Sequence, residues 1–203
     1  MKAFGRKEEI EKALSLLGAN MALAYAEDLR VLCCGGSALC MLEILTRSTK
    51  DVDALAFISD EKGLTRIDGF SEEVETAIVK TARALGLAED WFNAEASILL
   101  ERGLPPGILE RSARHVRHYG PCLTIHFVAR SDQVALKLFA AMDPAKGRRH
   151  GEDLATMEVS ADEMAHAIDW LCSFPPNVAF KRRLAFLVDG LGFPAQAGSI
   201  EVE

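Results

Sequence analysis

Two short segments in the first third of the chain contain residue types that could bind a nucleotide and a metal ion. The first is Gly35-Gly36-Ser37, which directly follows an apolar run. A tight glycine turn between a strand and a helix exposes backbone N–H groups, and these groups can hold a phosphate. Glycines also end strands for purely steric reasons, so this segment alone leaves both interpretations open.

The second segment contains two carboxylates at alternate positions, Asp51 and Asp53. Residues two apart on a strand project from the same face, so both negative charges would lie close together, which is costly unless a cation neutralises them. Carboxylate oxygens suit Mg²⁺ or Mn²⁺ that carries nucleotide phosphates. The alternative is an exposed strand end at which both acidic side chains are solvated.

The surrounding pattern predicts elements that would bring these two segments together. The apolar run 30–34 fits a buried strand, residues 38–45 favour a helix, and residues 51–58 are a candidate for a second strand. If the two strands are neighbours in one sheet, the turn and the carboxylates lie at the same edge.

The rest of the chain predicts an α+β (α/β-like) fold with a small mixed sheet flanked by helices. Helices are expected at 7–28 and 71–85, the second capped by Ser71 and ended by Gly86. A hairpin is expected within 115–128. From about residue 131 the pattern is helical, and the predicted domains are a core, 1–145, and a helical C-terminal extension packed on it, 146–203.

The combination of Gly35-Gly36-Ser37 with Thr49-Lys50-Asp51-Val52-Asp53 resembles the signature of the polymerase-beta-type nucleotidyltransferase superfamily. It is most similar to small prokaryotic nucleotidyltransferase-like proteins, including toxins of abortive-infection toxin–antitoxin systems. The resemblance implies a nucleotidyltransferase fold. It also implies that Gly36 and Ser37 contact nucleotide phosphate, and that Asp51 and Asp53 are the catalytic pair that ligates a divalent metal.

The similarity extends to residues on both sides of the two acidic positions. Arg47 fits the family's usual Arg-x-Thr-x-Asp-x-Asp run, which implies a nucleotide contact, although it could equally be a solvated residue in a linker. Trp91-Phe92-Asn93 resembles a Trp-x-Asn element of the relatives. We expect its aromatic rings to anchor the core.

Two later segments, 131–137 and 148–154, resemble the family's second pattern, in which an acidic residue precedes a helix with a lysine and an Arg-x-Asp-x-x-Asp-Leu run follows. By this resemblance Lys137 is expected to bind the triphosphate, because a flexible stem carries its point charge. Asp132 and Asp153 match the acidic positions of the pattern.

Each of these three residues also has a structural interpretation. Lys137 could lie at the rim of the core with its ammonium in solvent. Asp132 could cap a helix. Asp153 could be an acidic residue in the first turn of a helix, or it could pair with Arg148 or Arg149.

One departure from the family concerns the third carboxylate, which acts as the base on a later strand in catalytic members. Residues 122–128 of this chain contain no acid. His126 could in principle serve as the base, but a lone histidine on a strand is more often structural.

Composition limits the function classes. With 23 Lys+Arg against 30 Asp+Glu, the formal charge of −7 argues against a protein that coats nucleic acid, although the basic cluster 146–150 could contact a nucleotide or RNA locally. The sequence contains no uninterrupted apolar stretch of about 18 residues, so it predicts no membrane span. Five cysteines without metal-ligand spacing fit reduced thiols and a cytoplasmic location.

The leading functional hypothesis is a Mg²⁺-dependent nucleotidyltransferase that transfers a nucleoside monophosphate from an NTP to a hydroxyl acceptor. The acceptor could be a protein, an RNA or a small molecule, and the chain could be one component of a toxin–antitoxin pair. The alternative is a catalytically degenerate protein of the same fold that acts as a nucleotide-binding or protein-interaction module.

Overall fold

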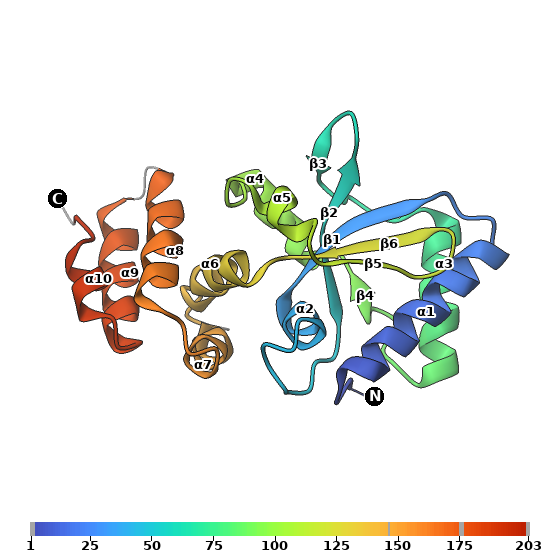
Figure 1. Ribbon diagram of the computed structural model, residues 1–203, viewed down its shortest axis with the longest axis horizontal. Coiled ribbons are helices and arrows are strands. Elements are labelled where there is room, and N and C mark those ends of the chain that lie inside the picture. Colours follow the sequence, from blue (N-terminus) through green and yellow to red (C-terminus); the bar gives the residue numbers. More distant parts are fainter. Residues whose placement is uncertain (1–2, 146, 175–176, 202–203) are drawn as a thin grey trace. The chain divides into compact units, whose positions relative to one another are not determined.

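The computed structural model describes residues 3–145, 147–174 and 177–201, and it divides into two compact units, Met1–Ala129 and Arg130–Glu203 (Figure 1). The first unit is mixed α+β and the second is helical in its described part. Within the described residues, no helix combines the length and the apolar character that crossing a bilayer requires. All five cysteines are free thiols.

The first unit contains a six-stranded mixed sheet in its described residues. Its main path runs in the order β3 (Gly63–Thr65), β2 (Val52–Ser59), β1 (Leu29–Cys34), β6 (Leu123–Phe127) and β5 (Val116–His118), and β4 (Phe92–Asn93) pairs with β2. Strand β1 is antiparallel to β2 and parallel to β6. Strands β5 and β6 form the predicted antiparallel hairpin.

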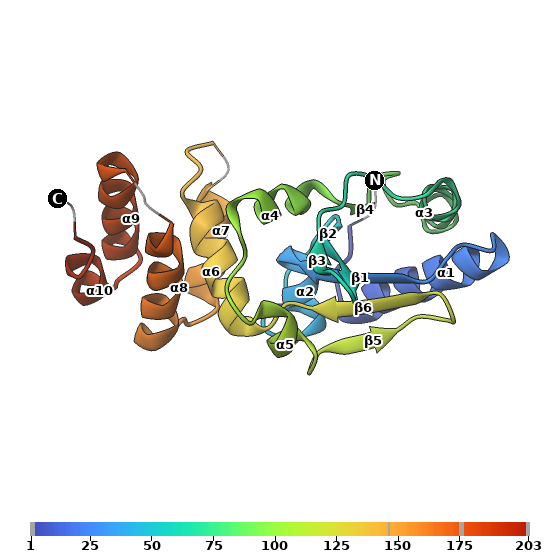
Figure 2. The ribbon, with the colours of Figure 1, turned by 90° about the horizontal axis from the view of Figure 1, so that it is seen from above.

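Helices of the first unit pack beside this sheet (Figures 1 and 2). They are α1 (Lys7–Leu23), α2 (Gly35–Met41), α3 (Glu72–Leu85), the 3-10 helix η1 (Glu95–Ile98), α4 (Leu99–Arg102) and α5 (Ile108–Ser112). Helix α3 begins after the Ser71 cap and ends at Gly86, as predicted. Helix α1 ends five residues earlier than predicted, because the chain turns at Tyr25, which has a φ of 54°.

Helix α1 packs against α3 and against the β5–β6 hairpin. Its apolar residues Ile10, Leu14, Leu17 and Met21 are fully buried. The Asn20 amide donates a buried hydrogen bond of 3.0 Å to the Thr81 hydroxyl on α3. At Gly18 the helix lies directly against the backbone of Tyr119, so an added Cβ would overlap the Tyr119 carbonyl. A glycine is therefore required for this close approach.

The second unit consists, in its described residues, of α6 (Arg130–Ala141), α7 (Gly147–Thr156), α8 (Ala161–Ser173), α9 (Val178–Gly190) and α10 (Pro194–Gly198). The unit boundary precedes the predicted domain boundary at residue 145, because α6 packs against α7 and α8. Trp170 on α8 makes edge contacts with Phe139 and Phe174. Packing of the helical part on the core stays a prediction.

The close approach at Gly18 makes a stability prediction. Replacing Gly18 with Ala should lower the free energy of unfolding by about 1–3 kcal/mol, because two backbones must move apart. Gly151 on α7 is the matched control, since an added Cβ there meets no atom within 4 Å. Gly151→Ala should raise the free energy of unfolding by about 0.5–1 kcal/mol through helix propensity. Urea denaturation followed by circular dichroism measures both, and equal effects would contradict the close packing.

Candidate functional site

The register of β1 and β2 brings the glycine turn and the Asp53 carboxylate together. The strands are antiparallel and pair Cys34 with Asp53, so the end of β1 and the start of β2 lie at the same edge of the sheet. Gly35 follows with a φ of 78°, a conformation that glycine adopts without strain. A Cβ at Gly35 would overlap Oδ2 of Asp53. The carboxylate therefore lies directly against the turn.

The next residue of the turn, Gly36, meets two more side chains of the candidate set. A Cβ at Gly36 would lie 2.9 Å from Oγ1 of Thr49 and 3.0 Å from Nη2 of Arg47. The half-buried Arg47 guanidinium therefore faces the turn rather than extending from a solvated linker. Its Nη1 also donates a 3.1 Å hydrogen bond to the Ser48 carbonyl.

Thr49 fixes the segment that leads into the two carboxylates. Its backbone exchanges two hydrogen bonds with Phe4, of 2.7 and 3.0 Å, and its hydroxyl donates to Oδ1 of Asp51 at 3.3 Å. Asp51 and Asp53 are both half-buried and flank the fully buried Val52. Because side chains alternate along a strand, the Asp53 carboxylate projects away from the side on which Val52 is buried, and Asp51 directly precedes the strand.

This donor set fits a magnesium ion that is shared with a nucleotide. Mg²⁺ usually binds one or two carboxylates and completes its octahedral coordination with waters and substrate phosphates. Asp51 and Asp53 supply such a pair beside a turn of backbone amides. Among the described residues, no group of three or more His, Cys, Asp or Glu side chains forms a metal cluster, so these carboxylates do not belong to a closed protein cage.

Ser37, on the first turn of α2, is completely buried. In the described part of the chain its hydroxyl has no hydrogen-bond partner. A buried hydroxyl without a partner is costly, so the turn contains one polar group whose hydrogen-bonding capacity the protein itself does not use.

His126 is buried on β6 and hydrogen-bonded within the protein, which favours a structural role. On β6 it pairs with Leu32 of β1, its side chain is 9% exposed, and its Nδ1 lies 3.4 Å from the Ser112 hydroxyl. That hydroxyl donates to the Leu109 carbonyl at 2.7 Å, so Nδ1 is the donor of the His126–Ser112 hydrogen bond. Burial lowers the pKa of His126, and the charges of Arg30 and His118 lower it further. Both effects favour the neutral form of the imidazole.

In the second unit, Lys137 and Asp153 form a buried ion pair. The Lys137 ammonium donates to Oδ2 of Asp153 at 2.7 Å, and the two side chains are 5% and 3% exposed. Nδ1 of His150 lies 3.4 Å from the same ammonium. Lys137 is thus neither at an exposed rim nor directed into solvent, and its contact with a nucleotide stays a prediction.

Two other structural alternatives from the sequence are wrong. Arg148 pairs with Glu152 at 3.0 Å, one helical turn away, while Asp153 pairs with Lys137. Asp132 is fully buried inside the first turn of α6, which begins at Arg130, so it is not the residue that caps this helix. Of the basic cluster 146–150, Lys146 lies outside the described residues, and the two arginines are exposed.

The aromatic residues of Trp91-Phe92-Asn93 are buried, as predicted. Asn93 pairs with Asp53 through β4, which the sequence did not predict, and β2 therefore lies between β4 and β1 at this edge. A strand of two residues is too short to give a periodic signal.

No family model, curated protein or solved structure matches the chain.

The buried ion pair predicts strongly non-additive effects on stability. Lys137→Met or Asp153→Leu alone should lower the free energy of unfolding by about 3–5 kcal/mol, because each leaves an uncompensated buried charge. The double variant should cost less than either single change. Urea denaturation of all four proteins tests this, and costs that simply add would show that the two charges do not depend on each other.

The lowered pKa of His126 predicts a pH-dependent stability. Unfolded chains protonate histidine near pH 6.5, whereas the buried imidazole does so only at lower pH. The contribution of His126 to the free energy of unfolding should therefore be constant above pH 6.5. It should fall as the pH drops from 6.5 toward the pKa of the folded state. His126→Asn should reduce the slope between pH 7 and 5 in denaturation experiments, and an unchanged slope would refute the assignment.

Proposed function

We propose that the chain is a Mg²⁺-dependent nucleotidyltransferase of the polymerase-beta type, with the sheet of the first unit as its nucleotidyltransferase fold. One observation carries the proposal: the Asp53 carboxylate lies against Gly35, while Arg47 and Thr49 lie against Gly36. A glycine turn, a cationic side chain and two acidic residues that follow each other at alternate positions thus lie near one sheet edge, and we propose that the turn holds the phosphates. The reaction requires these three functions in one place.

In the proposed reaction, an acceptor hydroxyl oxygen forms a bond to the α-phosphorus of an NTP. The bond from this phosphorus to the bridging oxygen breaks, pyrophosphate leaves, and the hydroxyl proton passes to a base or to water. Asp51 and Asp53 would hold Mg²⁺, which neutralises developing charge and acidifies the acceptor hydroxyl. The backbone amide of Gly36, together with Ser37 and Arg47, would position the phosphates.

The second candidate is a protein of the same fold that has lost catalytic activity, and a specific observation favours it. Strand β6 carries no acid, and its histidine is engaged with Ser112. Without a third carboxylate, the acceptor proton needs another route, for example through one of the metal-binding carboxylates or water. In this alternative the same edge binds a nucleotide without transferring it, and the protein acts as a nucleotide-binding or interaction module.

A toxin–antitoxin role would be an extension of either candidate, because it requires a second protein chain. For the transferase candidate the acceptor would be a protein, an RNA or a small molecule, and for either candidate the partner would be a second chain. The unused hydrogen-bonding capacity of Ser37 supports a ligand at the turn in each case.

The proposal predicts metal-dependent incorporation of α-labelled NTP into a protein, RNA or small-molecule acceptor, with each NTP tested separately. Asp51→Asn/Asp53→Asn should reduce labelling on the order of 100-fold or more, since the metal loses both carboxylates. Asp60→Asn/Glu61→Gln removes the same charge at the exposed far end of β2 and should label normally.

Calorimetric titration with NTP and Mg²⁺ distinguishes the two candidates. Binding that requires Asp51 and Asp53 but gives no labelling of any acceptor supports the nucleotide-binding module. A protein that neither labels an acceptor nor binds any NTP would overturn both candidates.

A further inference from the structure

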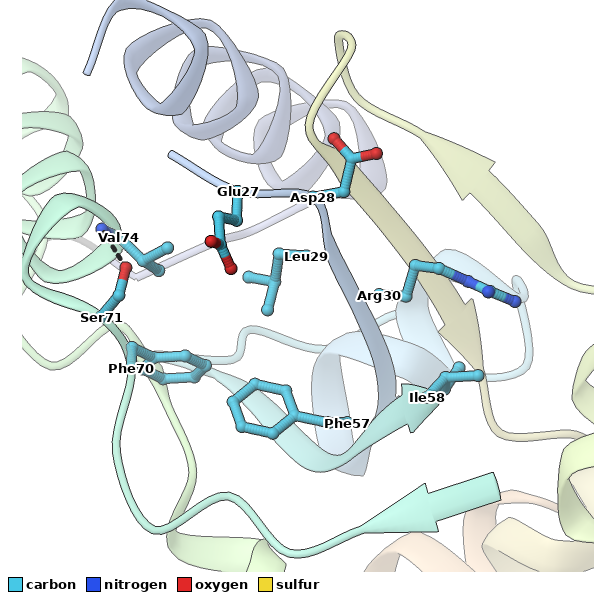
Figure 3. A pocket seen from close by; sticks show the side chains of 9 residues that line it. All are labelled: Glu27, Asp28, Leu29, Arg30, Phe57, Ile58, Phe70, Ser71 and Val74. Carbon is cyan, nitrogen blue, oxygen red and sulfur yellow. Dashed lines mark hydrogen bonds between the residues drawn. The ribbon is translucent and has the colours of Figure 1, made fainter. Parts of the chain in front are cut away.

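A pocket of about 230 Å³ lies in the first unit, away from the candidate site (Figure 3). It is lined by the start of β1, the end of β2 and the start of α3. The register pairs Val31 with Phe57 near the pocket and Cys34 with Asp53 at the glycine turn. The pocket and the turn are therefore at opposite ends of the same two strands.

Aromatic rings form one wall of this pocket. The centroids of Phe57 and Phe70 are 6.1 Å apart with the rings edge to face, and Phe70 lies 5.5 Å from Phe92 in a tilted arrangement. Phe92 is buried and contacts Trp91 in the core. Contacts of this kind hold the wall in a fixed orientation. The pocket thus presents a preformed aromatic surface.

One negative charge is directed into the pocket. In Figure 3 the Glu27 carboxylate points toward the space between Leu29 and Phe70, whereas the Asp28 carboxylate points away from it. Arg30 also points away and pairs with Asp60 at 2.6 Å. Within the described residues, Glu27 has no ion-pair partner. Glu27 is itself solvent-exposed, so the pocket combines an aromatic wall with one acidic group at its open side.

This chemistry selects a cation over an anion. An organic ammonium is attracted by a carboxylate and by the face of an aromatic ring. Ser71 at the start of α3 also lines the pocket, but its hydroxyl accepts from the Val74 N–H and its carbonyl accepts from the Glu75 N–H. A phosphate there would also meet the Glu27 carboxylate.

We propose that this pocket binds a small organic amine, with its ammonium group at Glu27 and its apolar stem against Phe57 and Phe70. The volume of about 230 Å³ is below the roughly 300–1,000 Å³ of pockets that hold drug-sized ligands, which restricts the ligand to a short stem. Binding requires neither a nucleotide nor a metal, so the proposal is independent of nucleotidyl transfer.

The test is a titration with 2-phenylethylamine, followed by calorimetry and by chemical-shift changes in isotopically labelled protein. The wild type should show saturable binding, with shift changes at Leu29, Phe57 and Phe70. Glu27→Gln should weaken binding about tenfold or more, because it removes the charge and keeps the shape. Asp28→Asn is the matched control and should change the affinity by less than about twofold, since that carboxylate points away.

Two further ligands complete the experiment. Phenylacetate has the same ring with a negative charge and should not bind, and inorganic phosphate should not bind either. Absence of amine binding to the wild type, equal weakening by the Glu27 and Asp28 variants, or binding of either anion at this pocket would overturn the proposal.

Discussion

The antiparallel pairing of β1 with β2 is the constraint on which the candidate site depends. Side chains alternate along a strand, so a slip of one residue would direct Asp53 to the other face of the sheet and separate it from the turn. The register is interrupted between Leu32 and Cys33, where the pairing shifts. From Cys33 onward the partners are Ala54 and then Asp53, so this irregularity sets which residue of β2 meets the turn.

The parts of the site that could be predicted from the sequence are those that depend on a short loop. Gly35 directly follows β1 and Asp53 lies on β2, and one helix joins these consecutive strands, so a strand–turn–helix–strand pattern is enough to place the two residues side by side. The partner of Asp153 could not be found in this way. Arg148 and Arg149 are near it in sequence, but Lys137 on the preceding helix reaches it through packing of α6 on α7.

Element boundaries were also determined by features without a periodic signal. The sequence predicts that the first helix extends to residue 28, but α1 ends at Leu23, before the positive φ of Tyr25. At the other extreme, Ser71 and Gly86 define both ends of α3 through local hydrogen bonds and backbone freedom, which depend only on neighbouring residues. Local chemistry was therefore predictable, and long-range packing was not.

The two units use ionisable groups in different ways. In the first unit the carboxylates of Asp51 and Asp53 are half-buried at a sheet edge, where an ion or ligand can approach them. In the second unit the charges of Lys137 and Asp153 neutralise each other in the interior. A charge that is satisfied internally contributes to a specific packing arrangement, whereas a partly exposed pair is suited to exchange with solvent and ligands.

The chain has two tryptophans, and each compact unit contains one of them. Trp91 is completely buried among phenylalanine rings and donates its indole N–H to the Ile78 carbonyl, while Trp170 is buried between Phe139 and Phe174. Their fluorescence emission therefore arises from two separate cores. Replacing one tryptophan with phenylalanine turns the other into an optical reporter of a single unit, so the folding of each half can be followed within the intact chain.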